Sequence, residues 1–176
     1  IQLFINIFPE SDSYERAMAM IDDLQKRFEE KAYQESTMYL RLTEGLYPGD
    51  FYKACIINFQ NFAKNYPDSK YNEELAFRLV EVSAAYGERS VFDKKEDRLK
   101  EAFAFAEQFK RKYPNSKYIG SVESTVLRAT IEYNEHLVLK KDYEERLAKA
   151  KLEQDKSAVS PEGEEVRTIP IPENNN

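Results

Sequence analysis

Tyr66-Pro67-Asp68-Ser69-Lys70-Tyr71 recurs almost unchanged as Tyr113-Pro114-Asn115-Ser116-Lys117-Tyr118. A looser copy, Phe8-Pro9-Glu10-Ser11-Asp12-Ser13-Tyr14, stands near the start of the chain. Proline lacks an amide hydrogen and disfavours the helical conformation in the residue before it, while serine or aspartate can cap the helix that follows. Each copy therefore predicts a corner where one helix ends and the next begins, with helix ends near Phe8, Tyr66 and Tyr113.

Repetition of these corners is the strongest signal for the fold. Each corner follows apolar residues spaced three and four positions apart, as on one face of a helix. In a solenoid every unit buries its apolar face against its neighbours, and the stacked units present a surface for recognition. We therefore expect an all-α, tetratricopeptide-repeat-like helical solenoid with a long C-terminal helix, whose function is binding.

The apolar spacing predicts seven helices. The first ends at Pro9 and has the appearance of a helix cut inside a repeat. Glu29-Glu30-Lys31 interrupts the next apolar stripe, so two separate helices are expected, over 12–28 and 31–44, with Gly45 ending the second. Asp93 and Glu96 have the spacing of a capping box. Four further helices are expected over 51–66, 75–87, 93–113 and 116–156.

The spacing of the corners supports this layout. Pro67 and Pro114 lie 47 positions apart, which leaves room for one helical hairpin and its loop. Pro9 and Pro67 lie 58 positions apart, which leaves room for a hairpin and one additional helix. Residues 31–67 carry the signs of a tetratricopeptide repeat, in which the small residue Cys55 is expected to be buried where the partner helix crosses.

Composition narrows the class of partner. The formal net charge is -6, which argues against a nucleic-acid binder, since affinity for phosphates comes mainly from clustered Lys and Arg. No apolar stretch approaches the roughly 20 residues of a membrane span. The one candidate basic patch comprises Lys110, Arg111, Lys112 and Lys117. We interpret it as a solvated helix end, where cations complement the helix dipole.

The chemical inventory favours a protein that is not an enzyme. His136 is the sole histidine and Cys55 the sole cysteine, so the usual zinc site cannot be assembled. Adjacent carboxylates such as Glu73-Glu74 and Glu144-Glu145 point to different sides of a helix and do not form an acid/base pair. We expect no catalytic residues, no cofactor and no metal.

Several segments together resemble one family. Ala19-Met20-Ile21-Asp22-Asp23-Leu24 precedes a charged stretch, and Tyr39-Leu40, Tyr52-Lys53-Ala54 and the corner Asn65-Tyr66-Pro67-Asp68-Ser69 follow in that order. This order is similar to that in the BamD family, the lipoprotein component of the machinery that assembles β-barrel proteins in the outer membrane. The resemblance covers residues 1 to about 135. The long turn 43–50 and the acidic tail from Glu153 depart from it.

The resemblance implies a scaffold without enzymatic chemistry, lipid-anchored on the periplasmic face of the outer membrane. It implies protein partners: the barrel-forming subunit with its periplasmic domains, and other assembly lipoproteins. In that family the early repeats are associated with unfolded barrel substrates and the late repeats with docking onto the barrel-forming subunit. This chain is expected to retain the docking end.

A candidate docking surface lies at the loop after the fifth expected helix. Phe92 stands between charged residues in an expected turn, where no helical seam is obvious for it to join. An exposed Phe there would favour a covering partner, although Phe92 can also fold back and cap the hairpin. The predicted interface comprises Tyr86, Glu88, Arg89, Phe92 and Arg98.

Two other functions remain open. A cochaperone-like peptide-binding module, periplasmic or cytosolic, would need Lys, Arg and Asn on the concave faces of successive first helices, and such a basic clamp is not evident. A glycan-related periplasmic solenoid lipoprotein would usually interleave tryptophan with its helices, and the chain has none.

Two regions are expected, a solenoid over residues 1–156 and a tail over residues 157–176. Pro161, Pro170 and Pro172 disfavour a helix in the tail. The tail is expected either to be disordered or to lie extended in a groove through Ile169 and Ile171.

Overall fold

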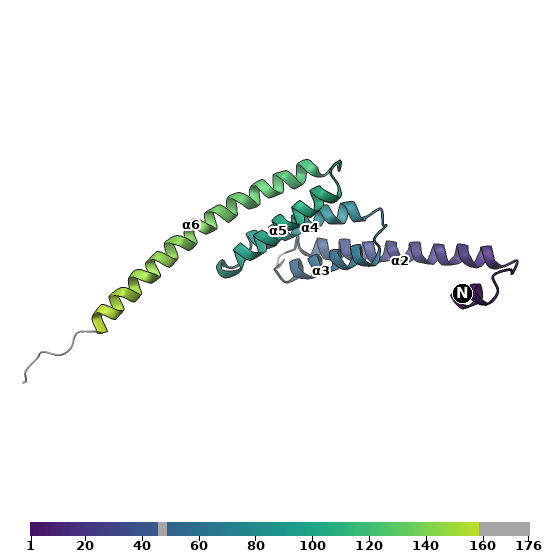
Figure 1. The fold of residues 1–176 in the computed structure, drawn as a ribbon, viewed down its shortest axis with the longest axis horizontal. Helices are drawn as coiled ribbons and strands as arrows, with labels where there is room; N and C mark the ends of the chain where they lie inside the picture. The colour runs from purple at the N-terminus through teal and green to yellow at the C-terminus, as the bar shows by residue number, and fades with distance from the viewer. Residues whose placement is uncertain (46–48, 159–176) are drawn as a thin grey trace, which may run out of the picture. The chain divides into compact units, whose positions relative to one another are not determined.

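The structure, a computed structural model, describes residues 1–45 and 49–158. Within these ranges it contains helices and no strand, which confirms the expected all-α class. The predicted ends near Phe8, Tyr66 and Tyr113 are confirmed too, because helices end one residue before each. The helices (Figure 1) are α1 (Gln2–Ile7), α2 (Tyr14–Leu42), α3 (Gly49–Asn65), α4 (Asn72–Glu88), α5 (Phe92–Lys112) and α6 (Ile119–Ala158).

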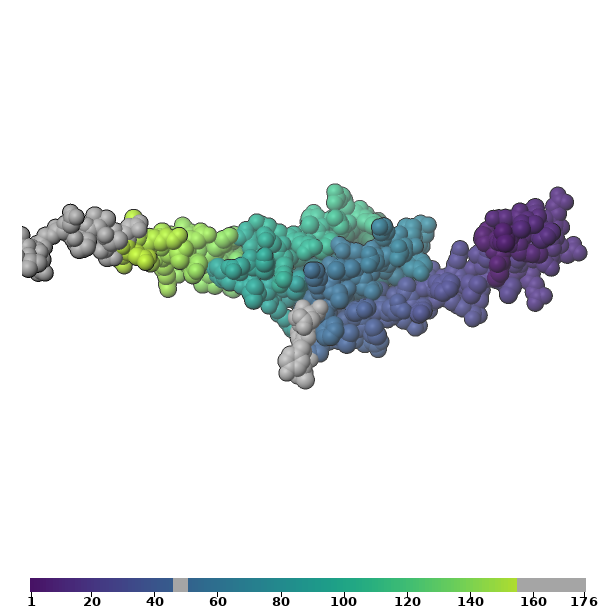
Figure 2. Space-filling view, turned by 90° about the horizontal axis from the view of Figure 1, so that it is seen from below, coloured from purple at the N-terminus to yellow at the C-terminus, as the bar shows by residue number. Residues whose placement is uncertain are grey.

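The prediction of seven helices is wrong, because α2 continues through Glu29-Glu30-Lys31. These charged residues interrupt the apolar stripe, but Glu and Lys are good helix formers and leave the backbone helix intact. The first two corners are 58 positions apart and the last two are 47 apart. The difference of 11 residues corresponds to about three turns of helix. They lengthen α2 instead of forming a separate helix. Its first turns carry α1 away from the packed helices α3, α4 and α5 (Figures 1 and 2).

The hairpin of α4 and α5 is packed closely at its loop end. Gly87, where the helix was expected to fray, is buried within α4. A Cβ atom on Gly87 would lie 2.6 Å from Cδ2 of the buried Leu99. The expected capping box at Asp93 is also wrong: α5 begins at Phe92 after the N-cap residue Val91, and Asp93 lies inside its first turn.

Cys55 lies in the core, as predicted. Its side chain is 0% exposed, in a cluster with Phe59, Phe62 and Val80. Burial raises the pKa of its thiol to about 12. Ser36, which the sequence did not single out, is equally buried and donates to Asn58 Oδ1 at 2.6 Å, so α2 and α3 share a polar contact within the seam.

The corners do more than turn the chain. Ser69 and Ser116 do not cap the following helices by N-cap bonds; each hydroxyl accepts the amide hydrogen of Tyr71 or Tyr118 at 3.1 Å. Each also donates at 2.6 Å to a carboxylate of the first helix of the hairpin before the corner, Ser69 to Glu29 of α2 and Ser116 to Glu73 of α4. The tyrosine two residues later stacks on a ring of that same helix. The stacked pairs are Tyr33 with Tyr71 and Phe77 with Tyr118.

The chain divides into two compact units, Ile1–His136 and Leu137–Asn176. The first contains the repeats, and Val122 and Ala129 of α6 are buried in its two apolar clusters. The described part of the second is the remainder of α6, which ends at Ala158, two residues later than expected. The division into a solenoid and a tail stays a prediction, since residues 159–176 and the groove hypothesis for Ile169 lie outside the described ranges.

Candidate interaction surface

All five predicted interface residues lie at the loop end of the α4/α5 hairpin. Tyr86 and Glu88 belong to the last turn of α4, Arg89 follows it, and Phe92 and Arg98 belong to α5. Their sequence positions span only 13 residues, so the hairpin brings them together by local geometry. That they bind a partner stays a prediction.

Both arginines are held by aromatic residues. Arg89 donates to the hydroxyl of Tyr52 at 2.7 Å, and its guanidinium carbon lies 5.8 Å from the centre of that ring. Arg98 stacks over Tyr86 at 3.9 Å and donates to Ser90 Oγ at 2.8 Å. The rings of Tyr52 and Tyr86 lie 5.7 Å apart. The two cations are therefore fixed on one aromatic base, which lowers the entropy lost when a partner binds them.

Glu88 and Phe92 attach the same loop to α6. Glu88 forms an ion pair with Arg128 at 2.7 Å. Phe92 presents its ring edge-on to His136, with the ring centres 4.6 Å apart. Its side chain is nonetheless 40% exposed, and Val91 beside it is 70% exposed. Phe92 therefore packs against α6 while part of its side chain stays exposed, and its contact with a partner stays a prediction.

The sequence did not identify the supporting residues. Tyr52, Ser90, Arg128 and His136 hold the five predicted residues in place, yet most of them lie in other helices. His136 is a helix residue, as expected, and is 4% exposed. Pairing the large residues of α3 with those of α4 would have suggested Tyr52, but nothing in the sequence places Arg128 beside Glu88.

The described residues contain neither a cluster suited to a metal ion nor a membrane-spanning helix. In residues 1–45 and 49–158, no group of three or more His, Cys, Asp or Glu side chains is arranged to hold a metal ion. In the same ranges no helix is long and apolar enough to cross a bilayer. The basic run Lys110, Arg111 and Lys112 lies in the last turn of α5, at the helix end where the dipole favours cations.

Comparison with protein families decides the relationship. The model of a family described as YfiO, outer membrane lipoprotein, matches residues 9–148. The chain belongs to this YfiO family. The match begins at the first corner and ends inside α6, and it confirms the resemblance to BamD and the helical-repeat fold.

The YfiO match also supports the broader expectations. Membership associates the chain with the outer membrane and with protein partners, and proteins of this type are generally scaffolds without enzymatic activity. A search of curated proteins gives no match.

Proposed function

We propose that this protein is a non-enzymatic scaffold, lipid-anchored on the periplasmic face of the outer membrane, that takes part in the assembly of β-barrel proteins. Its partners are the periplasmic domains of the barrel-forming subunit and other assembly lipoproteins. YfiO family membership supports the setting and the class of function. The observation that carries the docking role is the pair of arginines, Arg89 and Arg98, fixed on Tyr52 and Tyr86 beside an exposed apolar edge.

The composition of this surface suits a protein partner. Arginine and tyrosine are enriched among the residues that dominate binding energy at interfaces, and apolar groups such as Val91 and Phe92 lose contact with water when covered. The partner surface is expected to present carboxylates opposite Arg89 and Arg98, because bidentate pairing of a guanidinium with a carboxylate is strong and specific in geometry.

The cochaperone-like alternative is not favoured by the concave residues of α4. A clamp for an acidic peptide needs cations that are free to bind it. Arg78, the cation that α4 offers, is paired with Glu81 at 2.8 Å on the same helix. A carboxylate ligand would have to displace Glu81 before it could bind Arg78.

The test is binding of the purified barrel-forming subunit's periplasmic domains to this chain, measured by calorimetry. Arg89→Glu and Arg98→Glu should each weaken binding by about tenfold or more, as expected when a cation at the centre of an interface is reversed. Arg16→Glu is the matched control, since Arg16 is an exposed residue on the first turns of α2.

The two possible failures are distinct. If the wild-type chain does not bind the periplasmic domains, the docking function is overturned. If it binds and the variants at Arg89 and Arg98 behave like Arg16→Glu, the surface at the hairpin loop is not the docking site.

A further inference from the structure

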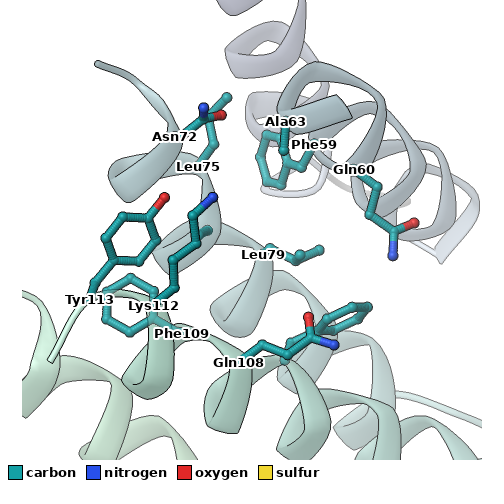
Figure 3. Close-up of a pocket in the computed structure, with 12 residues that line it drawn as sticks. Phe59, Gln60, Ala63, Asn72, Leu75, Leu79, Gln108, Phe109, Lys112 and Tyr113 are labelled. Carbon is teal, nitrogen blue, oxygen red and sulfur yellow. The ribbon is translucent and has the colours of Figure 1, made fainter. Parts of the chain in front are cut away.

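A pocket of about 240 Å³ lies at the opposite end of the α4/α5 hairpin, near the corners. Its walls come from α3, α4 and α5 (Figure 3). The apolar floor includes Phe59, Leu75 and Phe109, which are themselves buried. Small side chains at Ala63 and Ala76 leave the space above this floor open.

Polar groups stand at the edges of the pocket. Figure 3 shows Lys112 and Tyr113 on one side, and the amides of Gln60 and Gln108 on the other. The ammonium of Lys112 lies 5.3 Å from the centre of the Tyr113 ring, a cation–π distance that holds the charge near the rim. Lys112 is the one charged residue among the twelve that line the pocket.

The size of the pocket suits one aromatic ring. An engineered apolar cavity of about 150 Å³ is large enough to bind benzene. The volume here also leaves room for the first carbon of a side chain. A single ring inserted in a desolvated apolar pocket is a common anchor of protein interfaces.

The charge at the rim of the pocket determines which residues are favoured next to the inserted aromatic residue of the ligand. Lys112 gives the lining a positive charge, whereas Lys110 of the same last turn of α5 is paired with Glu107 at 3.6 Å. A positive rim favours a partner that brings a negative charge to it. The glutamine amides can donate to or accept from the backbone of an extended segment.

We propose that this pocket binds a peptide segment of a partner protein that inserts an aromatic side chain and places a carboxylate next to Lys112. The site goes beyond the proposed docking surface, since the two lie at opposite ends of one hairpin and share no residue. It assigns to Lys112 a role that a solvated helix end does not require.

The test uses the 176-residue chain with labelled leucine methyl groups and three blocked hexapeptides. The first has the sequence Gly-Ser-Phe-Glu-Ser-Gly, the second has Ala in place of Phe, and the third has Lys in place of Glu. The first should shift the methyl signals of Leu75 and Leu79 saturably, with a Kd on the order of 1 mM. The Ala peptide should bind at least about tenfold more weakly, since it lacks the anchor.

Charge variants separate recognition from a purely structural role. Lys112→Glu should reverse the preference, so that the Lys peptide binds more tightly than the Glu peptide. Lys117→Glu is the matched control: Lys117 also lies over a neighbouring tyrosine ring, at 5.0 Å, but does not line the pocket. It should keep the wild-type preference.

A filled pocket provides an independent check. Ala76→Phe places a ring in the space itself and should abolish the methyl shifts; if this variant does not fold, the two lysine variants decide alone. No saturable shift with the first peptide up to about 10 mM would overturn the proposal, as would an equal effect of Lys112→Glu and Lys117→Glu.

Discussion

The corners at 66–71 and 113–118 are fastened in the same way to the first helix of the hairpin before them, α2 and α4, whereas the corner at 8–13 shares only the local turn, in which the Ser13 amide donates to Ser11 Oγ at 3.2 Å. In all three the serine amide bonds to the carbonyl oxygen of the aromatic residue three positions earlier, at 3.1–3.3 Å. Only the later two have tyrosine at the sixth position, where the first has Ser13. The turn therefore forms in all three corners, while stacking on α2 and α4 occurs in the two that have the tyrosine.

The later two corners also differ from each other. The carboxylates that accept from their serines lie 44 positions apart, and so do the rings on which their tyrosines stack. The first of the two carries an additional polar contact, because the Tyr71 hydroxyl donates to Glu30. The ring on which the tyrosine stacks also differs: Tyr33 at 3.9 Å in the first and Phe77 at 4.4 Å in the second. The counterpart of Glu30 in the second repeat is Glu74, which accepts instead from the Tyr33 hydroxyl at 3.2 Å, so the same residue type makes a different contact in each repeat.

The largest expected effect is the protection of Cys55 from thiol reagents. Its counterpart in the next repeat is Ala102, since the two positions are 47 residues apart, as are Pro67 and Pro114. Both residues are buried. Burial raises the Cys55 pKa from 9.0 to about 12, so near pH 8 the native chain holds about a thousandfold less thiolate than the unfolded chain. Labelling by a thiol reagent should be slowed accordingly. If the repeats are equivalent, cysteine at Ala102 in a Cys55→Ala chain should be protected as well.

Labelling of the native chain within tenfold of the rate in denaturant would contradict the placement of Cys55. Protection of Cys55 without protection at position 102 would show instead that the two seams are packed differently.

Bulky substitution at the same two positions tests their packing. Cys55→Phe and Ala102→Phe each force a ring into a seam with no space for it and should lower the free energy of unfolding by about 1–3 kcal/mol. Chemical denaturation followed by circular dichroism measures the change. Met at Leu152, an exposed position of α6, is the control and should change stability little. A loss at one position only would break the equivalence of α3 and α5.

The sequence predicted the parts that depend on local chemistry. Pro67 and Pro114 predicted the ends of α3 and α5, and the repeated sequence motif predicted the solenoid and the burial of Cys55. It did not predict the continuous α2, because an interrupted apolar stripe and an interrupted helix look alike in sequence. Nor did it predict the contacts of Ser69 with Glu29 or of Glu88 with Arg128, since each joins residues about 40 positions apart whose approach depends on how the repeats pack.

A smaller effect is expected at the corner serines. Ser69→Ala and Ser116→Ala each remove a hydroxyl that accepts from a backbone amide and donates to a carboxylate. Each should lower the free energy of unfolding by about 0.5–1.5 kcal/mol, and the two losses should agree. Ser11→Ala, at the corner where the ring is missing, is the informative comparison. A loss at Ser11 as large as at the other two would mean that the turn, and not the fastening, accounts for the effect.

The smallest expected effect is a difference in the pH dependence of stability between the corners at 66–71 and 113–118. The hydrogen bond from Tyr71 lowers the pKa of Glu30 below its ordinary value of 4.5. A carboxylate whose pKa is lowered by folding stabilises the native state above its ordinary pKa, and this contribution is lost as the pH falls through the lowered value. Tyr71→Phe should therefore lower the melting temperature slightly near pH 7, and the difference from wild type should shrink as the pH falls below 4.5 and through the lowered pKa of Glu30. The Tyr118 ring stacks without such a carboxylate contact. The difference in melting temperature between Tyr118→Phe and wild type should therefore not depend on pH between 7 and the acidic range. Equal pH dependence in both variants would mean that the Glu30 bond does not set the first corner apart.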